Sequence, residues 1–400
     1  MAKKNEDPLD HCMIRFLVLV RVKSGVAGEF SLNGYERIIT ALKRGEEPDY
    51  VPIWELIINE PVINGLYGRI SCIDFVDKMD LDGICVQEDL QIAKFQGRPK
   101  ASVIDDFGIK WTYSGVVFQP SEGPIRSLED IDSYEFPDPN DKRKYVSLRA
   151  AVQRFKGKKA VAFLGHEGFE HSAYFLGGLV NLLKIYVTNP KAALKLAYRI
   201  WSYKEQVLRN AVELGADLLL TGDDYAFRDR SMVSPKHFKE FILPHLQKAV
   251  LIAKNAKLPF IKHTDGNLWD IIDMIVSTGI DGLHPLEPLA DMDIGKVKQH
   301  YGDRITVVGN IDCAYVLTQG TESEVVDAVK ETIAKASPGG GHIVSSSNSI
   351  HLGVRPENYK AMVQAARRYG KYPIEKGLID EYRGRDYVAS FMKNSSRRRE

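Results

Sequence analysis

The feature that most constrains the fold is a regular alternation of short β-rich runs and helical segments between residues 50 and 349. The runs have the Val, Ile and Leu content of buried strands, and apolar residues at helical spacing follow them. Neighbouring parallel strands need crossover connections of this kind. Eight such units predict a single (β/α)₈ barrel of parallel strands. The eight runs are residues 50–56, 83–87, 160–168, 217–225, 259–266, 280–288, 305–312 and 342–349.

Local signals mark several of the helices between these runs. Ser234 before Pro235 predicts a helix start, because serine caps the first amides and proline fits the first helical position. The Thr-Glu-Ser-Glu sequence at 321–324 predicts another start through a capping box. Between residues 168 and 218 the pattern predicts two helices that are broken at Asn189, which precedes a proline.

One connection is much longer than the others. Between Gln87 and Lys159 the chain inserts a segment that predicts a hairpin at 105–118 and a helix near 145–155. Connections of this length are usually functional or disordered. We therefore expect an insert after the second strand of the barrel that shapes the choice of substrate.

Composition excludes several classes of function. The chain has 54 basic and 53 acidic residues, so no global field favours nucleic acid or an anionic membrane. The apolar run 13–22 is far below the roughly 20 residues of a membrane span. The four cysteines lack metal-binding spacing, which fits a reducing cytoplasm. We expect a cytoplasmic protein, and the sequence leaves open whether it forms a homo-oligomer. Along the chain we expect an N-terminal extension at 1–30, one barrel domain at 31–385 and a basic tail at 386–400.

Titratable and polar side chains gather where the predicted strands end. In (β/α)₈ barrels the active site lies at the carboxyl ends of the strands. Any one of these residues could simply cap a turn, but loops have no general reason to collect His, Asp and Glu across six strands. Such a set can bind a metal or move protons. Its members include Glu55, His166, Glu167, Glu170, His171, Asp223, Asp224, Tyr225, His263, Asp265, His284, Glu287, Asn310, Asp312 and Asn348.

Four longer segments resemble the uroporphyrinogen decarboxylase superfamily. They are TGDDYAFRDRSMVSPKHFKEFILPHL, KHTDGNLWDIID, GLHPLEPLADMDIGKVKQHYGDRITVVGNID and SPGGGHIVSSSNSIHLGVRPENYKAM, and the resemblance covers roughly residues 31–375. It implies a (β/α)₈ barrel, in agreement with the strand pattern. It also implies one of two chemistries: cofactor-free decarboxylation of uroporphyrinogen, or methyl transfer with a corrinoid protein, often with zinc.

The decarboxylases of this superfamily hold a substrate with eight carboxylates by an arginine-rich segment after the first strand. Here residues 52–69 supply Glu55 and Glu60, and no arginine before Arg69. An acidic mouth repels a polyanion. Decarboxylation is therefore the less favoured alternative.

The zinc methyltransferases of the superfamily carry a His-x-Cys pair after the fifth strand and a further Cys after the eighth. His263 matches the first position, Asp265 replaces the first Cys, and the last position falls at or near Asn348. Two outcomes remain: His263 and Asp265 act as an acid/base pair without metal, or they hold zinc together with a carboxylate such as Glu167 or Glu287. Oxygen and nitrogen ligands make zinc a harder Lewis acid than thiolates do, and a harder ion binds an oxygen atom of the substrate better than a thiol.

The resemblance thus implies a methyltransferase that takes a methyl group from a small O-methyl or N-methyl donor and passes it to a separate corrinoid protein. A silent barrel that binds a partner is a weaker alternative, and a metal hydrolase is disfavoured because the first strand lacks an HxH pair. The predicted catalytic residues are His263, Asp265, Asp223, Asp224, Glu55, Asn310 and Asp312. The predicted substrate-binding residues are Tyr225, Glu167 and His284, and the predicted zinc ligands are His263, Asp265, Glu287 and Asn348.

Overall fold

The computed structural model describes residues 31–89, 101–113 and 118–397. By its contacts the chain separates into Met1–Ser31 and Leu32–Glu400. The description below concerns the second unit. The predicted extension at 1–30 lies outside the described residues. Within the described residues, no helix combines the length and apolar character that a membrane crossing requires.

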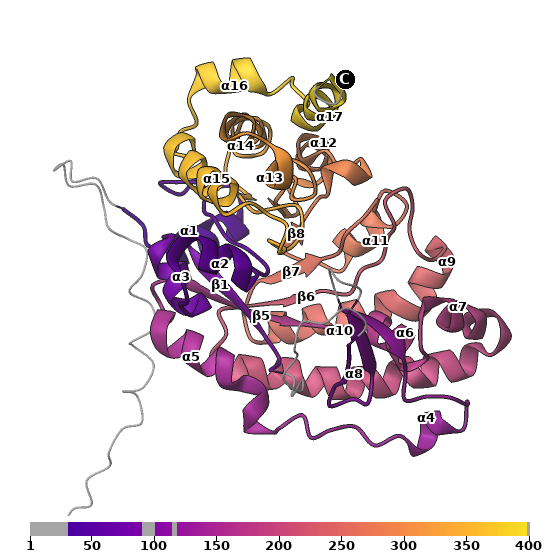
Figure 1. Cartoon of the computed structure of the whole chain (residues 1–400). Helices are drawn as coiled ribbons and strands as arrows, with labels where there is room; N and C mark the ends of the chain where they lie inside the picture. The colour runs from indigo at the N-terminus through magenta and orange to yellow at the C-terminus, as the bar shows by residue number, and fades with distance from the viewer. Residues whose placement is uncertain (1–30, 90–100, 114–117, 398–400) are drawn as a thin grey trace, which may run out of the picture. The chain divides into compact units, whose positions relative to one another are not determined.

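A parallel sheet of seven strands forms the centre of this unit among the described residues (Figure 1). Its strands follow one another in chain order, and each pairs with its neighbours in parallel. All seven coincide with predicted runs, and all except β1 end earlier than the runs do. They are β1 (Gly83–Gln87), β5 (Ala160–Gly165), β6 (Leu218–Thr221), β7 (Phe260–His263), β8 (Gly282–His284), β9 (Thr306–Val308) and β10 (His342–Ile343).

The predicted first strand, residues 50–56, is not a strand in the structure. Ile53 forms only an isolated parallel bridge with Val344. The segment still bonds to both ends of the sheet: Ile53 O accepts from Asp82 N at 2.9 Å, and Trp54 N donates to Val344 O at 3.1 Å. Pro52 lacks an amide hydrogen, which limits a regular ladder at this point. The structure therefore has seven parallel strands and a bridged segment, and the complete eight-stranded barrel stays a prediction.

Helices surround the sheet, and most of the predicted boundaries are confirmed. Ser234 caps α9, Thr321 forms the capping box of α14, and Asn189 caps α8. The helices are α1 (Gly34–Lys43), α2 (Glu60–Tyr67), α3 (Cys72–Lys78), α4 (Asp130–Ser133), α5 (Val146–Phe155), α6 (Phe169–Phe175), α7 (Leu179–Thr188), α8 (Pro190–Glu213), α9 (Pro235–His237), α10 (Leu243–Asn255), α11 (Ile272–Ser277), α12 (Ile294–Tyr301), α13 (Val316–Gln319), α14 (Glu322–Ala336), α15 (Pro356–Tyr369), α16 (Lys376–Tyr382) and α17 (Tyr387–Arg397), with 3₁₀ turns at Lys142–Tyr145 and Pro288–Ala290 and a π-helix at Phe238–Ile242.

Two segments differ from the predictions. Between residues 168 and 218 there are three helices instead of two, because Gly177 and Gly178, both at positive φ, separate α6 from α7. The predicted basic tail at 386–400 contains helix α17, in which Phe391 is buried. Through Phe391 this helix packs against the apolar core of the unit.

The insert carries its own antiparallel sheet in the order β2 (Ser102–Ile104), β3 (Lys110–Tyr113) and β4 (Phe118–Glu122). The pairing of β3 with β4 confirms a hairpin in this region, and β2 adds a strand that the sequence pattern missed. The predicted helix that follows is α5.

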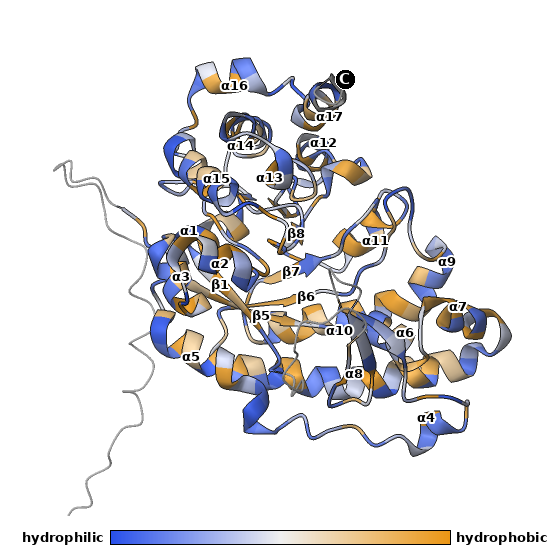
Figure 2. Cartoon of the chain, in the orientation of Figure 1, coloured by the Kyte–Doolittle hydropathy of each residue, from blue (hydrophilic) through white to orange (hydrophobic). Residues whose placement is uncertain are grey.

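Buried side chains pack on both faces of the parallel sheet, and alternation along each strand decides which face a residue joins. On β7, Ile261 joins the apolar cluster that contains Trp54 and Leu220, whereas Phe260 joins the larger cluster between sheet and helices. Apolar colour accordingly extends along strands such as β1 and β5 in Figure 2. His263, two residues after Ile261, follows the first of these faces, and Lys262 follows the second.

Candidate functional site

Three side chains converge at the ends of β6 and β7, and we call Asp224, His263 and Asp265 the His263 group. One ligand atom from each lies within 4.8 Å of the others. The Nε2 atom of His263 is 3.7 Å from Oδ1 of Asp224 and 3.7 Å from Oδ1 of Asp265. Asn348 donates from Nδ2 to Oδ2 of Asp265. The structure therefore brings together His263, Asp265 and Asn348, as the sequence predicted.

The turn after β7 is shaped by Gly266. Its φ is +83°, and a Cβ atom there would lie 2.5 Å from the carbonyl oxygens of Ala226 and Phe227. Glycine therefore lets this turn approach the chain after β6, where Asp265 N donates to Asp224 Oδ1 at 2.9 Å. Glu287, a predicted zinc ligand, accepts a hydrogen bond from Gly266 N at 3.3 Å and so lies beside the His263 group.

A chain of buried hydrogen bonds runs behind His263. Ser345 Oγ donates to Glu55 Oε2 at 3.2 Å, and Nε2 of His284 lies 3.2 Å from the same Oγ. Nδ1 of His284 lies 2.7 Å from Nδ1 of His263. The hydroxyl hydrogen of Ser345 is used toward Glu55, so His284 must donate from Nε2.

The direction of these hydrogen bonds determines which nitrogen of His263 carries a hydrogen. Burial lowers the pKa of His284 to about 3, and burial followed by His284 and Lys262 lowers that of His263 well below its usual range. Both rings are therefore neutral. Because His284 donates from Nε2, its Nδ1 accepts from Nδ1–H of His263. Nε2 of His263 is left as a lone pair that faces Asp224 and Asp265.

The pKa values of the carboxyl groups in this region are raised, whereas those of the two histidines are lowered. Burial raises the pKa of Asp224 to about 6. Burial, then the charges of Asp224 and Glu287, raise the pKa of Asp265 well above its usual range. Oδ1 of Asp265 is buried and has no hydrogen-bond partner among the described residues. A nitrogen lone pair and two carboxyl groups that face one another need a proton or a cation between them.

Glu55, at the end of this series of hydrogen bonds, carries a proton. Burial raises its pKa to about 8, so the carboxyl group is protonated at neutral pH. Ser346 Oγ lies 2.6 Å from Glu55 Oε2 and 2.5 Å from the carbonyl oxygen of Asn348. Since a hydroxyl has one hydrogen, Ser346 donates to the carbonyl oxygen of Asn348 and accepts the proton of Glu55 Oε2, which leaves a lone pair of Oε2 for the hydroxyl of Ser345.

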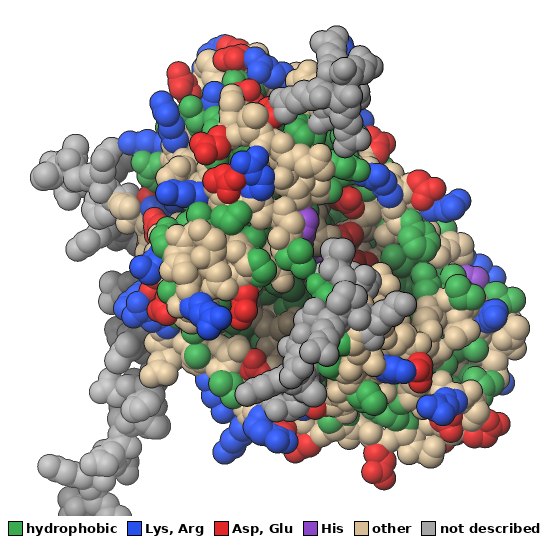
Figure 3. Space-filling view, in the orientation of Figure 1, with side chains coloured by type: hydrophobic (Ala, Val, Ile, Leu, Met, Phe, Trp, Pro, Cys, Tyr) green, Lys and Arg blue, Asp and Glu red, His purple; other side chains and the backbone are tan. Residues whose placement is uncertain are grey.

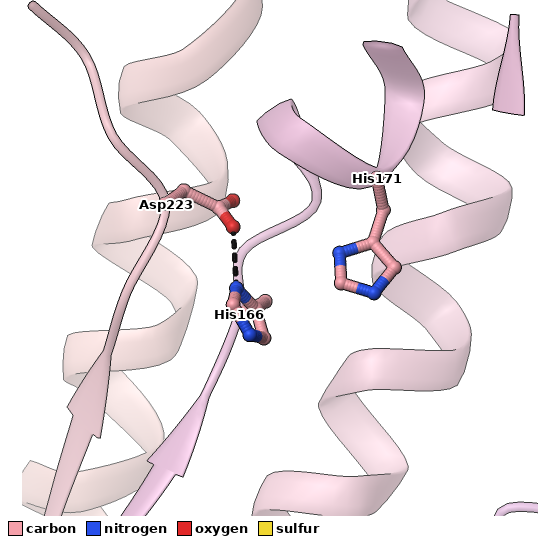
Figure 4. A group of neighbouring side chains, drawn as sticks. All are labelled: His166, His171 and Asp223. Atoms are coloured by element: carbon pink, nitrogen blue, oxygen red, sulfur yellow. Dashed lines mark hydrogen bonds and ion pairs between the residues drawn. The ribbon is translucent and has the colours of Figure 1, made fainter. Parts of the chain in front are cut away.

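A second cluster, which we call the His166 group, consists of His166, His171 and Asp223 (Figure 4). Nδ1 of His166 is 2.8 Å from Oδ1 of Asp223, while the other carboxylate oxygen accepts from the amides of residues 167, 168 and 169. Burial raises the pKa of Asp223, but His166 and Lys262 outweigh it, so the pKa falls below its usual range. A Cβ atom at Gly222 would lie 3.7 Å from Cε1 of His166 and 3.8 Å from Cδ2 of His263. The two groups thus flank one glycine.

Two of the predicted substrate-binding residues, Tyr225 and Glu167, contact a buried lysine in the layer between sheet and helices. Lys262, which the sequence reasoning did not single out, is fully buried and donates to Glu167 Oε1 at 2.7 Å. Tyr225 OH and Thr221 Oγ1 donate to the same oxygen, each at 2.7 Å. Tyr225 and Glu167 are buried, as is His284, which lies on the opposite face of the sheet beside Trp54 and His263. A lysine inside an apolar strand run was the signal that could have identified this ion pair.

Two predicted catalytic residues have their contacts elsewhere. Asn310 donates from Nδ2 to Leu286 O at 2.9 Å. Asp312 accepts at Oδ2 from the amides of Tyr315 and Val316, each at 2.8 Å, at the start of α13. The structure does not bring either side chain into the His263 group, and a carboxylate at this place is a typical helix cap.

A cavity of about 610 Å³ adjoins the hydrogen-bond chain, with Glu55 and Leu164 in its wall. Leu164 also lies next to Gly222, where a Cβ atom would be 2.9 Å from its Cδ1. The lining is mainly apolar; its acidic members are Glu55, Glu88 and Asp89, and no described residue of the lining is basic. The face of the unit in Figure 3 is hollowed near its middle, with acidic side chains and a histidine in the recess.

Comparison with known proteins agrees with this architecture. A methyltransferase from Methanosarcina mazei has the same fold, with a TM-score of 0.65, 16% identity, and coverage of 85% of this chain and 99% of that one. Uroporphyrinogen decarboxylase from Pseudoalteromonas atlantica is 27% identical over 64% of this chain and 74% of its own. The enzyme of that name from Myxococcus xanthus is 24% identical over 84% of this chain and 97% of its own. The uroporphyrinogen decarboxylase (URO-D) family model matches residues 103–369, and the chain belongs to this family.

Proposed function

We propose that this protein is a methyltransferase that takes a methyl group from an O-methyl or N-methyl donor. The observation that carries the proposal is the His263 group, where an imidazole lone pair and two carboxyl oxygens converge at 3.7 Å. The proposed acceptor is the cobalt of a corrinoid on a separate protein. Its support is the resemblance of the chain to the methyltransferase branch of the superfamily.

The donor atoms of the His263 group fit a zinc ion. One imidazole nitrogen and two carboxylate oxygens are ligands that zinc accepts, and Oδ1 of Asp265 is a buried oxygen in need of a partner. His263, Asp224 and Asp265 would hold the ion, with Glu287 and Asn348 beside them. When bound, zinc would supply a Lewis acid for the donor's oxygen or nitrogen.

The residues of the chain have their own part in either version of the mechanism. His284 and Ser345 keep the lone pair of His263 turned toward the mouth. Without metal, the raised pKa of Asp265 favours its protonated form, which can give its proton to the oxygen that leaves when the methyl group departs. Asn348 holds Asp265 in place for either role.

The cavity beside Glu55 supports a donor of low charge. Its apolar walls and volume suit a small organic molecule, and its acidic members disfavour a polyanion. Decarboxylation of uroporphyrinogen remains the second candidate, because curated relatives such as the Pseudoalteromonas atlantica protein have that name.

One pair of assays separates the two candidates. Protein would be mixed anaerobically with Co(I) cobalamin and a panel of methoxybenzoates and methylated amines, and methyl-cobalamin formation would be followed by absorbance. We expect turnover with at least one donor, loss of turnover in His263→Ala, and full activity in His300→Ala, which changes an exposed histidine. Release of CO₂ from uroporphyrinogen, together with no methyl transfer from any donor, would overturn the proposal in favour of decarboxylation.

A further inference from the structure

The sequence His166-Glu-Gly-Phe-Glu-His171 at the end of β5 has no part in the function proposed above. It places one histidine directly after the strand and a second one in α6. The two imidazole centroids are 4.9 Å apart, and one ligand atom each from His166, His171 and Asp223 lies within 4.8 Å of the others. Figure 4 shows the ring of His171 turned with one nitrogen toward the His166–Asp223 pair.

His171 has an unused nitrogen in this cluster. Its side chain is only 8% exposed, and its Nδ1 has no hydrogen-bond partner among the described residues. Burial, followed by the charges of Lys204 and His166, keeps the pKa of His171 well below its usual range, so the imidazole is neutral. A neutral imidazole with a buried, unpaired nitrogen is a good ligand for a transition metal.

The surrounding charges favour a cation here. Asp223 is ionised and held in place by three backbone amides. Glu170 contributes a further carboxyl oxygen 3.9 Å from Nδ1 of His166. The lysines that face the cluster already have partners: Lys262 pairs with Glu167 at 2.7 Å and Lys204 with Glu88 at 3.3 Å. Carboxyl groups thus outnumber the unpaired basic groups of the cluster.

We propose that His166, His171 and Asp223 form a second site for a divalent transition metal, with Glu170 within reach as a further ligand. Two nitrogens and a carboxylate oxygen suit zinc and its neighbours, and do not suit magnesium or calcium. The separation of 2.8 Å between His166 Nδ1 and Asp223 Oδ1 is close to the roughly 3.3 Å between neighbouring ligands of a tetrahedral zinc ion. Small side-chain movements would therefore admit the ion.

This site is separate from the His263 group but adjoins it. The His166 and His263 rings approach the same point at Gly222 from their two clusters, at 3.7 and 3.8 Å from a Cβ atom placed there. The proposal does not depend on methyl transfer, since it concerns the number of ions that the chain binds.

The test counts ions and assigns them to residues. Protein stripped by a chelator would be titrated with Zn²⁺ by calorimetry, and the bound metal would be counted by elemental analysis after dialysis. We expect two zinc ions in the wild-type chain and in His300→Ala, and one in His171→Ala. The ion that remains in His171→Ala should be lost when His263→Ala is added.

A further variant and a spectrum distinguish the loss of an ion from the loss of folding. His171→Gln keeps much of the shape of the side chain, and its circular dichroism and melting temperature should match those of the wild type while one ion is lost. Co²⁺ bound in place of zinc should show a visible absorption that falls by about half in the same variant. One ion in wild type that only His263→Ala removes would overturn the second site and leave the proposed function intact. One ion that only His171→Gln removes would support the second site and remove the metal version of the proposed function.

Discussion

The Nδ1 atoms of His263 and His284 lie 2.7 Å apart inside the protein, with both rings buried. Two neutral imidazoles can share one hydrogen at this distance only if one nitrogen donates and the other accepts. The hydroxyl of Ser345, which donates to Glu55, settles the direction. A glutamate within the bridged segment 50–56 therefore controls, through two other side chains, the nitrogen that His263 presents to the mouth.

Removing the hydroxyl of Ser345 from this series of hydrogen bonds should change which ring nitrogen of His263 carries the hydrogen. In Ser345→Ala, His284 loses the acceptor that holds its hydrogen on Nε2, so both ring forms of His263 become populated. We expect the ¹⁵N chemical shifts of labelled histidine to show this mixture, and zinc affinity to fall roughly 10- to 100-fold, as for other supporting residues of metal sites. Ser347→Ala is the control, because that buried serine contacts Cys313 instead. Equal shifts in both variants would contradict the assigned direction.

Loss of one carboxylate should weaken metal binding at the His263 group. Asp265→Asn keeps the shape of the side chain but removes its charge, and we expect zinc affinity to fall at least about tenfold. Asp291→Asn, which changes an exposed aspartate, should bind zinc as the wild type does. Calorimetry on both variants gives the comparison. Unchanged affinity in Asp265→Asn would exclude Asp265 as a ligand.

The buried carboxyl of Glu55 should make stability fall as pH rises. Its pKa is about 8 in the folded chain against an ordinary value of 4.5, so the folded state holds an extra proton between about pH 5 and pH 8. The free energy of unfolding should therefore decline across this window, by on the order of 3 kcal/mol. Glu55→Gln has no proton to lose, so its stability should decline less over the same range. Urea unfolding at pH 5, 6.5 and 8 measures both proteins; parallel curves would show that Glu55 titrates normally.

The turn that carries Asp265 should tolerate no side chain at Gly266. Gly266→Ala combines positive φ with backbone oxygens at 2.5 Å, so we expect a loss of roughly 3 kcal/mol or more in the free energy of unfolding. Gly45→Ala is the matched control, since Gly45 also has positive φ but open space around it. That variant should lose only about 1 kcal/mol. Similar losses in the two variants would mean that the close approach to residues 226 and 227 is unimportant.

The ion pair of Lys262 with Glu167 should be needed for stability. Lys262→Met leaves Glu167 buried without its charged partner, and we expect a loss of roughly 3 to 5 kcal/mol in urea unfolding. Adding Glu167→Gln to Lys262→Met should restore part of this loss, because the uncompensated carboxylate is removed. A double variant less stable than Lys262→Met would show that Glu167 does not carry the penalty.

Much of the candidate site followed from local sequence. His263 ends β7, Asp265 stands two residues later, and Asp224 follows the neighbouring strand β6, so their meeting required only the parallel order of β6 and β7. The π-helix at Phe238–Ile242 and the extra break at Gly177 were not predicted, because packing against neighbouring helices decides such local departures.

The amino-acid sequence by itself determined the parallel α/β arrangement, the positions of seven strands, and the family, because hydrophobic periodicity and turn residues act over short distances. It also indicated that His and Asp side chains would crowd at the strand ends. The tertiary structure alone decided which of them work together: Glu55 meets Ser345 across 290 residues of chain, and Asp312 caps a helix instead of joining the mouth. Those relationships depend on which face of a strand each side chain takes and on what lies opposite it, and no local pattern contains that information.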